Sequence, residues 1–268
     1  MTPRPKIRSS TRKVACTNQK GGVGKSSTVL FVAEAAAELG ARVVVRDLDP
    51  QGNVSIALAP SEVVYTMNDV LRPAEDTGEV VEGCLGSAIR PAGSQWPKGL
   101  YVVPASLAQA DRETDQSIGR EYRLRTVSAG ALDGVDLVLD DCPPSVGQLT
   151  VNALVDDDDV LLVTTAEYWP LQGTHQAFRT IKRVQRFYNP ELNLIGVQVN
   201  AFKAGRVETR TRMAELETTY PGLLWEPVPD MEVIRKAVGA ISPLAAYGSE
   251  ASEARDHYRR IAERLLNN

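Results

Sequence analysis

A glycine-rich run between a strand pattern and a helix pattern constrains the fold of this chain more than any other feature. The run Gly-Gly-Val-Gly-Lys-Ser occupies residues 21–26, after a predicted strand at 13–17 and at the start of a predicted helix at 25–39. Glycines let backbone N–H groups curl around an anion, and a helix N-terminus adds partial positive charge. The run therefore predicts a phosphate-binding loop, although a flexible turn has a similar composition.

The rest of the chain alternates between short apolar runs and longer amphipathic stretches. Runs such as 43–45 and 161–163 are apolar throughout, which is typical of parallel strands buried on both faces. This alternation predicts an α/β fold, a doubly wound and mostly parallel sheet with helices on both faces. The predicted strands are 13–17, 42–48, 100–104, 135–140, 160–164, 194–200 and 223–228. We expect a basic, disordered tail at 1–12 and a single domain at 13–268.

Charge and cysteine content narrow the functional classes. The chain has 30 Lys and Arg against 34 Asp and Glu, so contact with nucleic acid would require a local basic patch. No apolar run approaches the roughly 20 residues of a membrane-spanning helix. The three cysteines match no metal-site spacing and indicate a reducing compartment, so we expect a cytoplasmic protein.

The residues around the loop form a more specific motif than the general pattern GxxxxGK[ST], which they do not fully satisfy. The run from Asn18 to Ser27, NQKGGVGKSS, resembles the deviant Walker A motif, KGGVGK[ST][ST], of the ParA and MinD superfamily of P-loop ATPases. Residues 46–53, RDLDPQGN, resemble the second nucleotide motif in its ParA form, and 136–145, DLVLDDCPPS, resemble the Walker B strand and turn. The resemblance is to the short form of ParA, without an N-terminal helix-turn-helix.

The resemblance implies a site for ATP and Mg²⁺. Lys25 would meet the β- and γ-phosphates, and Lys20 would reach the nucleotide of the other subunit in an ATP-dependent homodimer. Asp49 would orient the attacking water, which makes Lys20, Lys25 and Asp49 the catalytic candidates. The magnesium candidates are Ser26, Asp49 and Asp141. The candidates for binding the nucleotide are Lys20, Gly21, Gly22, Val23, Gly24, Lys25, Ser26, Ser27, Asn200 and Pro229. Asn200 could equally be a turn residue at the end of a strand.

The chain departs from the ParA pattern after Val228 and Pro229, where ParA proteins commonly have an arginine of the DNA-contacting surface. This chain has Asp230 there. The candidate substitutes for DNA binding are Arg206, Arg210, Arg212, Arg235 and Lys236, each of which could equally belong to a solvated helix face.

A second departure places opposite charges, Arg46 and Asp140, on two strands that should be neighbours and fully buried. An unpaired buried charge costs on the order of 3 to 5 kcal/mol. We therefore predict an ion pair between Arg46 and Asp140 beneath the site.

The resemblance implies a DNA-partitioning ATPase of plasmid or chromosome segregation with slow intrinsic turnover. Its ATP dimer would bind non-specific double-stranded DNA, associate with the nucleoid, and be released by hydrolysis that a ParB-like partner stimulates. Asp230 favours an alternative, an ATPase switch that positions a protein cargo or regulates cell division. A metabolic P-loop enzyme is a third class. A last helix is predicted from Ser249, its cap, with one apolar face formed by Ala251, Ala254, Tyr258, Ile261 and Leu265. We expect no membrane attachment, because this face indicates a packing helix and no basic segment follows it.

Overall fold

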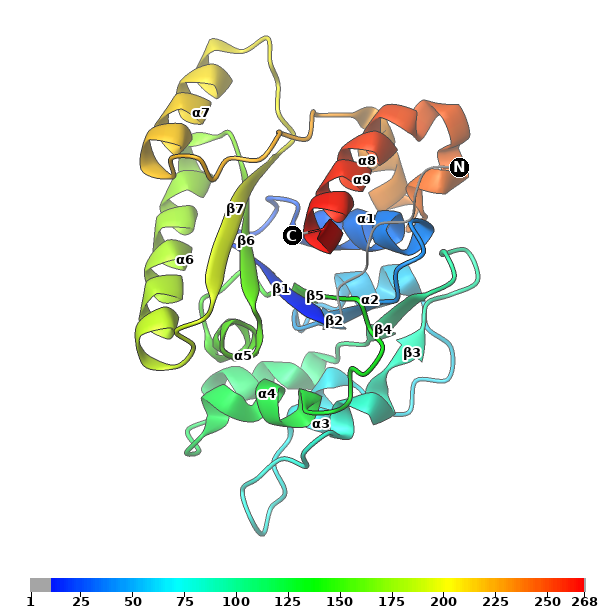
Figure 1. Ribbon diagram of the computed structural model, residues 1–268, viewed down its shortest axis with the longest axis vertical. Helices are drawn as coiled ribbons and strands as arrows, with labels where there is room; N and C mark the ends of the chain where they lie inside the picture. Colours follow the sequence, from blue (N-terminus) through cyan, green and yellow to red (C-terminus); the bar gives the residue numbers. More distant parts are fainter. Residues whose placement is uncertain (1–10, 268) are drawn as a thin grey trace.

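The computed structural model describes residues 11–267, which form one seven-stranded sheet with helices on both faces (Figure 1). The strand order is β3-β4-β2-β5-β1-β6-β7, and every neighbouring pair is parallel except β3 with β4. The strands are β1 (Arg12–Thr17), β2 (Val43–Asp47), β3 (Arg90–Pro91), β4 (Leu100–Val103), β5 (Leu137–Asp141), β6 (Asp159–Thr165) and β7 (Asn193–Asn200). The predicted doubly wound α/β fold is confirmed.

Helices cover the sheet because alternate residues of its central strands face opposite layers. Val43 and Val45 join one apolar cluster with α1, α8 and α9, whereas Val44 joins a second cluster with α5 and α6. The α-helices are α1 (Lys25–Glu38), α2 (Asn53–Leu58), α3 (Met67–Leu71), α4 (Arg123–Ser128), α5 (Gln148–Asp156), α6 (Tyr168–Phe187), α7 (Val207–Thr219), α8 (Glu232–Gly239) and α9 (Ser252–Asn267). The 3-10 segments are η1 (Cys84–Ala88), η2 (Leu107–Thr114), η3 (Arg120–Tyr122) and η4 (Leu244–Ala251).

The sheet brings three segments of the candidate site to one edge. β1, β2 and β5 are parallel neighbours, so the loops that follow them all leave from their carboxyl ends. The register of β2 and β5 pairs Asp47 with Asp141 and Arg46 with Asp140. The carboxyl edge of an open α/β sheet is where such folds bind ligands.

The prediction of a strand at 223–228 is wrong. This segment runs beside β7 and forms only an isolated bridge between Val197 and Leu224. The Trp225 N–H donates to the carbonyl of Val197, and a regular ladder would next use the N–H of residue 227. That residue is Pro227, which has no N–H, so Val228 donates to Val199 instead and the register slips.

The two ends of the described chain pack against each other across the fold. β1 begins one residue earlier than predicted, because Arg12 is buried, pairs with Asp159 at 2.6 Å and donates to the carbonyl of Leu265 in α9. Residues 1–10 of the predicted tail lie outside the described residues. Among residues 11–267, no helix has the length and apolar character needed to cross a membrane.

The C-terminal helix buries the predicted apolar face but begins later than predicted. Ser249 is not its cap, because Ser249 lies inside η4 and its carbonyl accepts a hydrogen bond from the Ser252 hydroxyl. Gly248 has non-helical dihedrals that kink the chain just before it, so α9 begins at Ser252. The predicted face is buried at every position: Ala251, Ala254, Tyr258, Ile261 and Leu265.

Candidate functional site

The loop between β1 and α1 has the backbone shape of an anion cradle. Gly22 and Gly24 have φ values of 76° and 86°, in the left-handed region that side chains with a Cβ rarely adopt. Gly24 is also the residue that precedes the first turn of α1, and no side chain caps that turn. The N–H groups in the first turn of α1 are therefore free to bind an anion.

Two asparagines brace the loop, Asn18 at its start and Asn200 at the end of β7. The Asn18 amide donates to the carbonyl of Val163 at 2.8 Å, and its oxygen accepts the Lys20 N–H at 3.1 Å. The Asn200 amide donates to the carbonyls of Val23 and Gly24, both at 3.2 Å, and to the Thr28 hydroxyl at 2.9 Å. A Cβ on Gly24 would lie 2.7 Å from the Asn200 amide nitrogen, so the position requires glycine.

The two loop lysines occupy different environments. Lys25 is buried, and its ammonium donates to the carbonyl of Lys20 at 3.2 Å, inside the loop. Burial lowers the pKa of Lys25, while Asp141 and Asp49 act against that change. Lys20 is half-buried, and its side chain makes no ion pair with any residue in the described range 11–267. Lys25 is thus held inside the loop, whereas the Lys20 side chain has no ionic partner among the described residues.

Asp141, at the end of β5, is the strongest candidate for holding a cation. Its side chain is fully buried, and among the described residues neither carboxylate oxygen has a hydrogen-bond partner. Burial, and next the Asp47 carboxylate, raise the pKa of Asp141 well above its usual range, while Ser26 and Lys25 act against the rise. Orphaned carboxylate oxygens beside a serine hydroxyl fit a hard cation such as Mg²⁺, which prefers oxygen ligands and keeps several waters.

Asp47 and Asp49 form the second acidic element of the site, at the end of β2. Asp47 accepts hydrogen bonds from the N–H and hydroxyl of Ser55, at 2.8 and 2.6 Å, and from the N–H of Asp49. Burial raises the pKa of Asp47 to about 6 despite these bonds. Asp49 accepts the Gln51 N–H and lines the cavity beside the loop. Asp47 therefore fixes the turn that presents Asp49.

Two adjoining cavities meet at the loop and share Gly22, Gly24 and Ser27 in their walls. The first, of about 730 Å³, collects the polar candidates Gly21, Lys25, Ser26 and Asp49. The second, of about 370 Å³, is more apolar and is lined by Asn200, Pro229, Met231, Ile234 and Tyr258, among others. A polar compartment next to an apolar one suits a phosphate chain joined to an aromatic base.

Arg46 is the centre of a buried ion cluster below the site. Its guanidinium contacts Asp140 at 2.6 Å, Asp156 at 2.5 Å and Asp157 at 2.6 Å, and it donates to the Ser128 hydroxyl at 2.8 Å. The predicted ion pair between Arg46 and Asp140 is confirmed, with both side chains fully buried.

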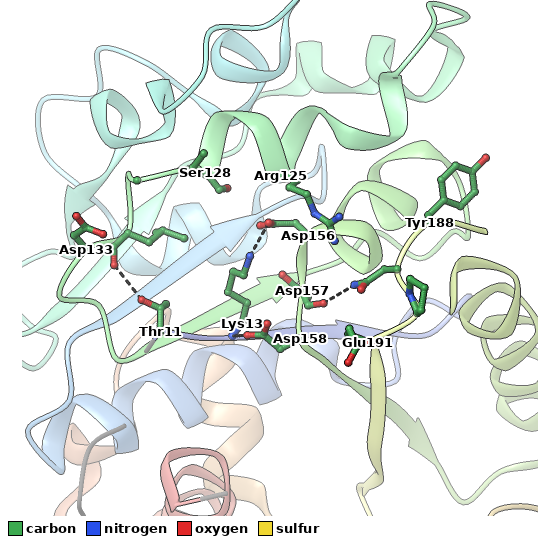
Figure 2. A pocket seen from close by; sticks show the side chains of 15 residues that line it. Thr11, Lys13, Arg125, Ser128, Asp133, Asp156, Asp157, Asp158, Tyr188 and Glu191 are labelled. Atoms are coloured by element: carbon green, nitrogen blue, oxygen red, sulfur yellow. Dashed lines mark hydrogen bonds and ion pairs between the residues drawn. The ribbon is translucent and has the colours of Figure 1, made fainter. Parts of the chain in front are cut away.

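The outer side of this cluster borders a third cavity, at the sheet edge opposite the loop. The cavity has a volume of about 670 Å³, and Asp156 and Asp157 line it (Figure 2). Lys13 reaches Asp156 across it at 2.6 Å. The ion cluster therefore connects the strands that carry the site carboxylates to this far edge.

The candidates for DNA binding divide into paired and unpaired cations. Arg235 pairs with Asp230, Lys236 with Glu232 and Glu250, and Arg212 with Glu215. Arg206 and Arg210 are exposed and make no ion pair with any residue the structure describes. The five cations therefore do not form one free basic surface.

One positioning contact at the site was not anticipated. Glu113 in η2 accepts the Gln148 N–H at 2.6 Å and the Ser145 hydroxyl at 3.3 Å, so it caps α5 and holds the turn after β5. Glu113 lies 32 residues before Ser145 in an irregular region, and no short motif marks it. Only the packing of η2 against α5 reveals the contact.

A comparison with protein families matches residues 11–194 to a family described as an AAA domain. The chain is 31% identical over 261 residues to the chromosome-partitioning ATPase Soj of Thermus thermophilus, covering 97% of each chain. It is 36% identical over 197 residues to the chromosome partitioning protein ParA of Caulobacter vibrioides, covering 71% of this chain and 70% of the relative.

Among solved structures, the chain resembles cobyrinic acid a,c-diamide synthase from Mycobacterium smegmatis with a bound ATP analogue and magnesium. The two are 30% identical, superpose with a TM-score of 0.75, and cover 96% of this chain and 95% of the other.

Proposed function

The chain belongs to the ParA family of the ParA/MinD superfamily, and from this membership and the geometry of the site we propose that it is a Mg²⁺-dependent ATPase of DNA partition. The observation that carries the proposal is that a buried loop lysine, Lys25, and a buried carboxylate without a hydrogen-bond partner among the described residues, Asp141, lie at the same edge of the sheet. The partition role is supported by the Thermus relative, which aligns with nearly the whole chain.

The polar cavity provides the groups that a triphosphate and its metal require. The loop N–H groups and the Lys25 ammonium would bind the β- and γ-phosphates, and Ser27 would contact the α-phosphate. Ser26 and Asp141 would hold Mg²⁺, which neutralises phosphate charge when bound. The described residues contain no group of three or more His, Cys, Asp or Glu able to hold a metal, so phosphate and water would complete the shell.

The apolar cavity is the proposed adenine site. Asn200 already uses its amide to brace the loop, but its oxygen is buried and has no partner among residues 11–267. That oxygen is an acceptor for the amino group of a purine base. The backbone at Pro229 and the side chains of Met231 and Tyr258 provide the remaining walls. Asn200 would thus serve both as a loop brace and as a base contact.

Hydrolysis would use Asp49 to orient the attacking water, and Lys20 to stabilise the nucleotide of a second subunit. Asp49 is held by the turn that Asp47 organises, and it faces the same cavity as Lys25. A cation donated by each partner offsets the phosphate charge that opposes a face-to-face dimer. We expect slow turnover by the isolated protein, because among the described residues Asp49 is the only carboxylate that lines the polar cavity, and no other general base does.

In the proposed cycle, the ATP dimer binds non-specific DNA, and a ParB-like partner stimulates hydrolysis and release. The alternative is an ATPase that positions a protein cargo. It is favoured by Asp230, which forms ion pairs with Arg235 and Lys203 and so makes these two cations less available to DNA. The likeness to a diamide synthase structure supports a second candidate, ATP-dependent activation of a small carboxylate. The full-length match to a partition ATPase favours partition.

A comparison of Lys20→Ala with Lys25→Ala tests the proposal. We expect Lys25→Ala to lose ATP binding, and Lys20→Ala to bind ATP as the wild type does but to remain monomeric. Binding of a fluorescent ATP analogue and light scattering with ATP or ADP would measure the two effects. Normal ATP-dependent dimers of Lys20→Ala would refute the role of Lys20. DNA-independent turnover that requires a small carboxylate would favour the synthase.

A further inference from the structure

Helix α6 presents a row of four cations on one face. Arg179, Lys182, Arg183 and Arg186 recur at steps of three, one and three, so they fall within one sector of the helix, and all four are exposed. The opposite side packs into the core and includes Thr174, Ala177, Ile181 and Val184. We call these four cations the α6 row. Its orientation is fixed, because the apolar face of α6 is occupied.

The α6 row is not neutralised by neighbouring carboxylates. The sequence of α6, residues Tyr168–Phe187, contains no Asp or Glu, and none of the four cations makes an ion pair with a residue in the described range. Cations on α9 behave differently: Arg255 pairs with Glu38, and Arg259 pairs with Glu263. Because the chain as a whole has a net charge of −4, these four adjacent cations without ionic partners form a local positive patch on an acidic protein.

Aromatic rings hold two members of the row in place. Lys182 lies 5.4 Å from the centre of the Phe178 ring, and Arg186 lies 5.1 Å from that of Phe187. These contacts reduce the conformational entropy that long side chains lose when they bind a partner. The row is therefore partly ordered before any ligand arrives.

The geometry of the row fits the phosphates of a nucleic-acid duplex. Residues 179 and 186 are seven positions apart, which is about 10 Å along a helix. The same length of duplex axis carries about six phosphates. A membrane-binding helix inserts its apolar face into lipid, but that face of α6 is buried in the protein core. Charge without a free apolar face favours DNA over a lipid surface.

From these observations we infer that the α6 row is a contact surface for the phosphate backbone of double-stranded DNA. The inference rests on the proposed function, and it locates that contact on α6 rather than on Arg235 and Lys236, which are ion-paired. None of the four cations lines the two cavities at the loop. The surface can therefore be changed without touching the nucleotide site.

The test compares two double variants with the same charge change and the same spacing. Arg179→Gln/Arg183→Gln removes two free cations of the α6 row, and Arg255→Gln/Arg259→Gln removes two paired cations of α9. Affinity for a non-specific 30-base-pair duplex is measured with a non-hydrolysable ATP analogue at 50 and 200 mM salt. Each phosphate contact contributes about 0.9 to the slope of log affinity against log salt. The α6 variant should therefore reduce the salt-induced loss of affinity by about 12-fold.

We expect the α9 variant to keep the wild-type salt slope, and both variants to bind the ATP analogue normally. Arg179→Lys/Arg183→Lys should also keep the slope, because it preserves both charges. A wild-type slope in the α6 Gln variant overturns the α6 assignment while leaving the partition function intact. No duplex binding by the ATP-loaded wild type overturns both. Loss of binding to phosphatidylglycerol vesicles, with duplex binding unchanged, would assign the row to a membrane.

Discussion

Replacing Arg46 by Met would leave three buried carboxyl groups without the guanidinium that contacts them all. Asp140 loses a two-bond contact at 2.6 and 2.8 Å, and Asp157 loses a contact at 2.6 Å. Asp156 retains Lys13 at 2.6 Å. Removing one partner of a buried ion pair costs about 3–5 kcal/mol, because the remaining charge is uncompensated. We expect Arg46→Met to lose about this much free energy of unfolding at pH 7.

The loss should depend on pH with a definite sign. Burial raises the pKa of Asp140 and of Asp157, whereas for Asp156 the effects of Arg46 and Lys13 outweigh burial and lower its pKa. Without Arg46, the pKa values of all three rise, so the folded variant takes up protons that the unfolded chain, with pKa values near 3.9, releases. The pKa of Asp156 is the one that changes from lowered to raised, so the stability deficit of the variant relative to the wild type grows as pH rises above 4, by about 1.4 kcal/mol per pH unit.

Equilibrium unfolding in urea at pH 5 and pH 7 measures both effects. With a denaturant slope of about 3 kcal/mol per molar, the urea midpoint of Arg46→Met at pH 7 should be about 1 to 1.7 M below that of the wild type. At pH 5 the difference in free energy of unfolding between the two proteins should be about 3 kcal/mol smaller than at pH 7. The control Arg255→Met breaks an exposed pair with Glu38 and should cost less than about 1 kcal/mol. Arg46→Met/Asp140→Leu should recover part of the loss, because it removes the stranded carboxylate. A deficit that does not change with pH would refute the electrostatic reasoning.

Three further outcomes follow from the site. Asp49→Ala should bind ATP and dimerise but not hydrolyse it, since the group that orients water is gone; unchanged phosphate release would remove Asp49 from the reaction. Glu113→Ala should lower the free energy of unfolding by about 1 kcal/mol in the same urea titration, because a helix cap is lost. The control Glu121→Ala should change the free energy of unfolding little, because the partner of Glu121 is the adjacent Arg120. Gly24→Ala should cost about 1 to 3 kcal/mol and weaken nucleotide binding, because its φ is 86° and its Cβ would meet Asn200; calorimetry showing wild-type affinity would contradict this.

Much of the fold was predictable because it depends on local patterns. Fully apolar runs predicted the buried strands β2 and β6, and Gly40, with a φ of 91°, follows α1 where its C-terminus was expected. The exception at 223–228 shows the limit of this approach. Its apolar residues suited a strand, but Pro227 fell where the ladder required an N–H, and that position depends on the register with β7.

The sequence alone determined the loop, its two lysines and the carboxylates at the ends of β2 and β5, because glycine spacing and apolar strand runs are local patterns. It also predicted the ion pair of Arg46 with Asp140, since opposite charges stood on strands expected to be neighbours. Only the tertiary structure decided that Asp157 shares the same guanidinium, that Glu113 caps α5, and that α6 bears free cations while those of α8 are paired. The first two contacts join side chains more than 30 residues apart in the chain, and the third depends on which carboxylates pack near each helix, so no local pattern encodes them.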